Sequence, residues 1–194
     1  MYTTGMILWP IMQVIYGLYA YRYLRHIGYS NEKIFGFSAF KQRLLRNIII
    51  IIILIAVSEL LFYAEGLIYI ITYSMTYEEY WEQFAAILVR IPYWLRLFTW
   101  LVGPFTAGIF EELFFRAYGI NMLEESRASK IEANLIQAIA FGLWHGLTMH
   151  ALITFLIGFT FGYFYLSDKE RSLMPLIIAH WIIDFVGFMI FISV

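Results

Sequence analysis

The chain has 194 residues, of which 62% are apolar and 14% are charged, and its mean hydropathy is +0.73. Soluble domains are on average about 45–50% apolar and about 25% charged, and a fold of this size leaves much of its surface exposed. The net charge of −1 offers no concentrated basic face for nucleic acid, and the lack of cysteine excludes disulfides and thiolate metal sites. The composition therefore predicts an integral membrane protein that does not bind nucleic acid.

A membrane-spanning helix needs about 20 mainly apolar residues. Six segments have this character: 2–21, 48–71, 97–120, 131–148, 151–166 and 174–194. The strict alternation of apolar and polar residues that a membrane β-barrel requires is missing. The sequence thus predicts an all-α, polytopic membrane bundle of about six transmembrane helices.

Positive charge alternates from loop to loop. Six cations follow the first span, whereas the segment 72–96 holds only Arg90 and Arg96. The third loop is basic again, with Arg127 and Lys130, and the link near 149–150 has no cation. Because Lys and Arg favour the cytoplasmic side, this pattern predicts a multi-pass cell-membrane protein whose two termini are extracytoplasmic. The mixed aromatic and charged residues of 73–96 predict a helix that lies in the headgroup region.

Ionisable side chains within the last four spans point to a functional site. Each costs at least about 2.5–3.5 kcal/mol in hydrocarbon, so such residues usually line cavities and serve a function. Glu112 and Arg116 are four residues apart and can neutralise one another on one helix face. Glu111 is rotated from Glu112 by about 100° and remains available for chemistry. His180 and Asp184 are also four residues apart, so they project together from the last span.

Three of these spans can bring their side chains to one site. At ~1.5 Å of rise per residue, His180 lies about 9 Å, Glu111 about 15 Å and His145 about 20 Å from the cytoplasmic helix ends, and tilt can absorb the differences. A carboxylate in a pocket of low dielectric can take a proton from water with the help of a histidine. A second histidine can donate to the developing oxyanion. The same three residues also suit zinc, but no His-Glu-x-x-His helix specifies a metal, so we assign no cofactor and keep zinc as the alternative.

Three motifs resemble those of the CAAX protease and bacteriocin-processing (CPBP, or Abi) intramembrane endopeptidases. Residues 110–116 contain Glu-Glu-x-x-x-Arg, residues 141–145 contain Phe-x-x-x-His, and residues 180–184 contain His-x-x-x-Asp, where the family has Asn or Asp. The motifs follow the family order and extend over about half of the chain, roughly residues 97–190. The chain is thus similar to the type II CAAX prenyl endopeptidase.

The resemblance implies a function for each motif. Glu111 and His145 would activate water, and Glu112 and Arg116 would support the site structurally. Residues 97–194 would form a four-helix catalytic core. Residues 1–96 carry no part of the resemblance; from their own sequence we expect two transmembrane helices, the basic cytoplasmic loop and the interfacial segment, in the same integrated membrane domain.

The third motif leaves a choice open. His180 and Asp184 would form the oxyanion site, but an ionised carboxylate cannot donate a hydrogen bond. Asp184 is therefore protonated by burial, or orients His180, or helps to hold a cation. Outside the motifs, Glu59 lies in mid-span without a cation on its own helix; a structural role is favoured over one at the substrate entrance. His150 lies in an external link, where we expect it to be solvated rather than catalytic.

Three functions are consistent with these features. The first is an intramembrane endopeptidase that hydrolyses a membrane-associated protein or hydrophobic peptide. The second is a non-enzymatic membrane partner that regulates a sensor kinase or confers bacteriocin immunity. The third is a small proton-coupled transporter, although the paired broken helices of transporters are missing. The expected partners are membrane lipid, a protein or peptide substrate and a second membrane protein, and the short architecture indicates a bacterial source.

Overall fold

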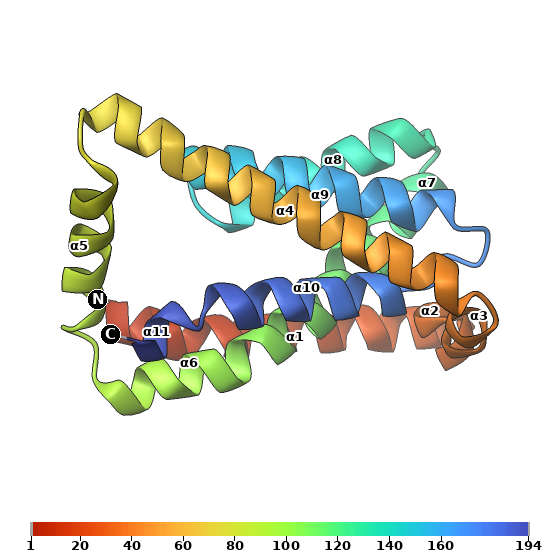
Figure 1. The fold of residues 1–194 in the computed structure, drawn as a ribbon. Helices are drawn as coiled ribbons and strands as arrows, with labels where there is room; N and C mark the ends of the chain where they lie inside the picture. The colour runs from red at the N-terminus through yellow and green to blue at the C-terminus, as the bar shows by residue number, and fades with distance from the viewer. Residues whose placement is uncertain (1, 194) are drawn as a thin grey trace.

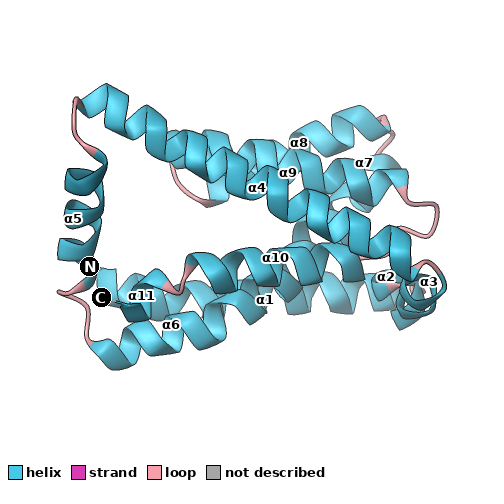
Figure 2. Ribbon diagram, viewed as in Figure 1, coloured by secondary structure: helices cyan, strands magenta, loops and turns pink. Residues whose placement is uncertain are grey.

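The computed structural model describes residues 2–193, with the side chains of residues 5–193, and over this range it contains helices and no strand (Figures 1 and 2). The all-α prediction is therefore confirmed for the described residues. The long elements are α1 (Tyr2–His26), α4 (Leu44–Tyr73), α5 (Tyr77–Leu88), α6 (Tyr93–Thr106), the π-helix η1 (Ala107–Ile120), α8 (Lys130–Trp144), α9 (Met149–Ser167) and α10 (Met174–Gly187). The short ones are α2 (Asn31–Phe35), α3 (Phe37–Gln42), α7 (Asn121–Glu125) and α11 (Ile190–Ser193).

Three helical segments of the described chain are long and apolar enough to cross a membrane: α4, α9 and Met174–Ser193. A fourth span arises if α5 and the rod Tyr93–Glu125, which are bent by 103°, are one span. The protein is thus a multi-pass membrane protein, but the criteria of helix length and apolar composition identify fewer spans than the six expected. The helix α8 has only 15 residues. The helix α1 is long enough, but its Tyr, Trp and Gln side chains make it less apolar.

The long helices form two layers (Figure 1). One layer holds α4, α8 and α9, and the other holds α1, α6 and α10, with η1 passing between them. At the end near both termini, α5 runs across from the α4 layer to the α6 layer. This orientation suits the predicted interfacial helix, which stays a prediction because the structure contains no membrane.

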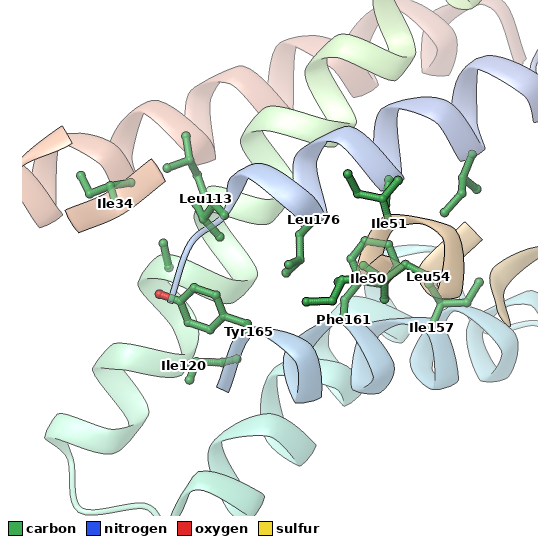
Figure 3. Close-up of a cluster of buried hydrophobic side chains, with 14 of the residues drawn as sticks. Ile34, Ile50, Ile51, Leu54, Leu113, Ile120, Ile157, Phe161, Tyr165 and Leu176 are labelled. Atoms are coloured by element: carbon green, nitrogen blue, oxygen red, sulfur yellow. The ribbon is translucent and has the colours of Figure 1, made fainter. Parts of the chain in front are cut away.

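The apolar core lies at the other end, where the layers meet (Figure 3). Leu54 of α4, Leu113 of η1, Phe161 of α9 and Leu176 of α10 belong to one cluster of buried side chains. This core holds α4 and α9 against η1 and α10 and thereby fixes the segments that carry the first and third motifs.

Two helices begin at capping boxes. The Ser129 hydroxyl accepts from the Glu132 N–H while the Glu132 carboxylate accepts from the Ser129 N–H, and Thr76 and Glu79 make the same pair at α5. Each box satisfies two backbone donors that a helix start leaves without partners. The sequence therefore fixes the start of α8, which carries the second motif.

Small residues allow α8 and α9 to approach closely. A Cβ on Gly158 would lie 2.8 Å from the Cδ1 atom of Phe141, and one on Gly162 would overlap the Asn134 amide. Membrane helices use such residues to bring backbones together. The α8–α9 hairpin thus depends on glycine at these positions.

We expect Gly158→Ala to lower the free energy of unfolding by about 1–3 kcal/mol, because the methyl group forces Phe141 to move. Gly66→Ala on α4 is the matched control, since no heavy atom lies within 4 Å of the added carbon. Thermal melting of both variants in detergent, followed by circular dichroism, measures the difference. Equal melting temperatures for the two would contradict the packing argument.

Candidate active site

The first motif lies in a wide helical turn rather than in a regular α-helix. The rod continues through Pro104, which removes a backbone donor, and from Ala107 to Ile120 its hydrogen bonds run from i to i+5. Such wide turns place more residues in each turn, so successive side chains diverge less than in an α-helix. Glu111 and Glu112, expected on different faces, are consequently both buried, at 3% and 0% exposed. Wide turns of this kind are frequent at functional sites.

A buried chain of charges runs from η1 to α10. The Nε atom of Arg116 lies 3.3 Å from Oε2 of Glu112, and Oε1 of Glu112 lies 2.8 Å from Nδ1 of His180. The guanidinium of Arg116 also lies 4.4 Å from the centre of the Phe141 ring, which adds a cation–π attraction. Glu112 therefore has two partners, of which spacing indicated only Arg116.

His180 lies among three carboxylates. Its Nδ1 atom faces Glu112, and because an ionised carboxylate only accepts hydrogen bonds, this nitrogen carries a proton. Its Nε2 atom lies 3.6 Å from Oδ2 of Asp184 and 3.9 Å from Oε2 of Glu111. The Nε2 atom is thus the part of the ring that faces the other two carboxylates.

Two donors hold one oxygen of Glu111 and leave the other without a hydrogen bond. The Oε1 atom accepts from Nε2 of Gln13, at 2.7 Å, and from Nε1 of Trp144, at 3.0 Å. The Thr106 hydroxyl donates to the Gln13 side-chain oxygen at 2.6 Å and so fixes the amide with its NH₂ toward Glu111. The buried Oε2 atom has no hydrogen-bond partner, which leaves its lone pairs available.

His145 caps the end of α8 and lines the same cavity as Glu111 and His180. Its Nδ1 atom lies 2.8 Å from the Phe141 carbonyl oxygen. A carbonyl cannot donate, so Nδ1 carries the proton and Nε2 of the neutral ring is an acceptor. No hydrogen bond joins His145 directly to Glu111 or His180 among the described residues, so the structure places them around a shared space.

That space is a cavity of about 1340 Å³ between the two layers. Every ionisable residue that the sequence singled out for the site lines it: Glu111, Glu112, Arg116, His145, His180 and Asp184. Glu59 of α4 lines it too and makes no hydrogen bond or ion pair with the described residues. A structural role for Glu59 thus finds no support in its contacts.

Sequence reasoning missed several neighbours of these residues. Gln13 is the one amide in the apolar and aromatic stretch 5–21. This isolated polar side chain was the signal that could have identified it as part of the site. His150, expected to be solvated, has a side chain 41% exposed, but its Nδ1 atom lies 3.0 Å from Oε2 of Glu65 on α4. Its ring centre is 5.8 Å from that of His145, and both His150 and Glu65 line the cavity.

The side chains do not form a ready metal site. Within residues 2–193, no group of three or more His, Asp or Glu side chains is arranged to hold a metal ion. The alternative ligand set of Glu111, His145 and His180 stays a prediction.

We expect Gln13→Leu to lower kcat by on the order of 10²-fold with little change in KM, because a carboxylate displaced by about 1 Å loses its alignment. The matched control is Met12→Leu, one position along α1, where the side chain is exposed. Steady-state kinetics and melting temperatures separate the outcomes. A rise in KM at constant kcat, or a loss of stability alone, would show that Gln13 does not position Glu111.

A comparison with protein families matches residues 92–186 to the Rce1-like family, described as type II CAAX prenyl endopeptidase Rce1-like. The matched region runs from the start of α6 to the end of α10 and contains all three motifs, while α1–α5 lie outside it. Comparisons with curated proteins and with solved structures give no match. The family match confirms the resemblance seen in the motifs: residues 92–186 of the chain are similar to the type II CAAX prenyl endopeptidase Rce1-like family of proteases.

Proposed function

We propose that this protein is an intramembrane endopeptidase that hydrolyses a membrane-associated protein or hydrophobic peptide, with Glu111 as the general base. The observation that carries the proposal is the Glu111 carboxylate, which is 3% exposed. Its Oε1 atom is held by two donors, and its Oε2 atom has no hydrogen bond at a cavity wall. A carboxylate that is desolvated and held in this way is suited to accept a proton from water.

The first step is the attack of water on the peptide carbonyl. Oε2 of Glu111 takes one proton from a water molecule, while Nε2 of His145 accepts a hydrogen bond from the same water and orients it. The water oxygen forms a bond to the carbonyl carbon, and the carbonyl π electrons move to its oxygen. The resulting oxyanion accepts a hydrogen bond from protonated Nε2 of His180.

The second step breaks the peptide C–N bond. The oxyanion re-forms its double bond, and the leaving nitrogen takes the proton that Glu111 received, which returns Glu111 to its ionised form. Asp184, 3.6 Å from Nε2 of His180, stabilises the protonated imidazole rather than donating to the oxyanion. Glu112, itself paired with Arg116, holds the other side of the ring. The products are a carboxylic acid and an amine.

A library of hydrophobic peptides, offered to the purified protein in liposomes, tests the proposal. We expect mass spectrometry to find new peptide ends with the wild-type protein and none with Glu111→Gln. The same ends at the same rate in both samples would contradict the role of Glu111. A cellular phenotype that persists in Glu111→Gln would favour the non-enzymatic partner instead.

A further inference from the structure

The cavity continues from the active site towards α5. Beyond His145 its wall is formed by the C-terminal half of α4 and by α5, and we call this part the outer chamber. It is lined by Glu59, Glu65 and His150, and by the aromatic side chains of Phe62, Tyr63, Tyr69, Tyr73, Tyr77, Tyr80, Trp81 and Phe84. No residue of the basic segment 22–46 lines the cavity. The outer chamber therefore lies at the end of the molecule opposite that segment. The charge pattern predicts that this end is extracytoplasmic.

The charges on the cavity wall are strongly unbalanced. Five carboxylates line it, namely Glu59, Glu65, Glu111, Glu112 and Asp184; the cations on the same wall are Arg116 and the protonated ring of His180, with no lysine. Arg116 is fully buried against Glu112, so it is not available to a ligand. Such a wall favours a positively charged occupant and repels a free carboxylate, and a cavity of low dielectric strengthens both effects.

Glu65 is separated from His145 by the ring of His150. Its side chain is 13% exposed and lies 3.0 Å from His150. The His150 ring stacks on Phe62, with centres 5.9 Å apart and planes at 15°, and lies 5.8 Å from the His145 ring. A group bound at Glu65 therefore lies in the same cavity as His145, on the far side of the His150 ring.

Glu59 adds a carboxylate that no side chain of the described protein neutralises. It is exposed on α4, one of the helices apolar enough to cross a membrane, and an unpaired charge in such a segment is costly. A cation from the substrate would compensate it. Aromatic faces in the same wall, such as the stacked Tyr69 and Tyr73 rings, also attract cations.

We propose that the outer chamber binds a lysine or arginine side chain of the substrate, through Glu65 and Glu59, so that the enzyme selects hydrophobic peptides with a cation near the cleaved bond. The inference rests on the proposed function for its link to cleavage. The two recognition residues belong to α4, outside the family-matched region.

Peptide binding to the Glu111→Gln variant tests the proposal without cleavage. Three hydrophobic peptides, identical except for a central Lys, Gln or Glu, are titrated into the variant in liposomes of phosphatidylcholine, which has no net charge. We expect the Lys peptide to bind on the order of tenfold more tightly than the Gln peptide, and the Glu peptide to bind most weakly. Adding Glu65→Gln and Glu59→Gln should remove the preference, whereas Glu78→Gln, at an α5 carboxylate that does not line the cavity, should preserve it.

A charge reversal distinguishes a change in selectivity from a loss of folding. Glu59 has no partner to disturb, so Glu59→Lys, introduced into the Glu111→Gln variant, should bind the Glu peptide more tightly than the Glu111→Gln variant alone. Equal binding of the three peptides, or a Lys preference that survives both α4 substitutions, would overturn the inference. Cleavage that depends on Glu111 but shows no charge preference would overturn this inference and leave the proposed function standing. Lys-selective binding without cleavage would instead overturn the proposed function and leave the binding site standing.

Discussion

Glu111→Gln should lower kcat by at least about 10²–10⁴-fold, the usual contribution of a general base, and leave the melting temperature almost unchanged. Glutamine has the same shape, and its side-chain oxygen can still accept from Gln13 and Trp144. Its NH₂ group then replaces Oε2 and cannot take a proton from water. Kinetics on a peptide from the library, with the purified variant in liposomes, measure the effect.

Glu125→Gln is the matched control for this experiment. Glu125 is an exposed carboxylate of α7 and does not line the cavity, so its neutralisation should leave kcat unchanged. An equal fall in both variants would point to a general electrostatic effect. A Glu111→Gln variant that keeps more than about a tenth of the activity would exclude Glu111 as the general base.

Arg116→Met should destabilise the protein by about 3–5 kcal/mol, because it leaves Glu112 as a buried charge without its cation. Both side chains are 0% exposed, so water cannot compensate the loss. Unfolding in detergent, followed by circular dichroism, gives the change in the free energy of unfolding.

The double variant Arg116→Met/Glu112→Leu separates stability from activity. Replacing a whole buried ion pair by apolar side chains is often neutral or stabilising, so we expect much of the lost stability to return. Activity should remain low, because His180 has lost the carboxylate that holds its Nδ1 atom. Recovery of full activity in the double variant would show that Glu112 does not position His180.

The parts of the site that follow from spacing along one helix could be predicted from the sequence. Glu112 and Arg116, and likewise His180 and Asp184, are four residues apart, and the structure brings each pair within 3.6 Å. The helical class followed from the long apolar segments. The number of spans was harder to predict, because short and aromatic helices such as α8 and α1 do not meet a simple hydropathy criterion.

The contacts between helices could not be predicted. Gln13 and Trp144 meet at Glu111 from α1 and α8, and a single sequence does not state which helices are neighbours. The wide turn of η1 changes which side chains point inward, and periodicity at 3.6 residues does not anticipate it. The pairing of His150 with Glu65 joins residues 85 positions apart, for which the sequence carried no local signal.

Hydrolysis in water labelled with ¹⁸O tests the central claim most directly. The wild-type protein in liposomes is given a library peptide, and mass spectrometry determines where the heavy oxygen goes. We predict one ¹⁸O atom in the newly formed carboxyl group of the N-terminal fragment, and no fragments with Glu111→Gln. Fragments without solvent oxygen, or labelled fragments formed equally fast by Glu111→Gln, would contradict the activation of water by this buried carboxylate.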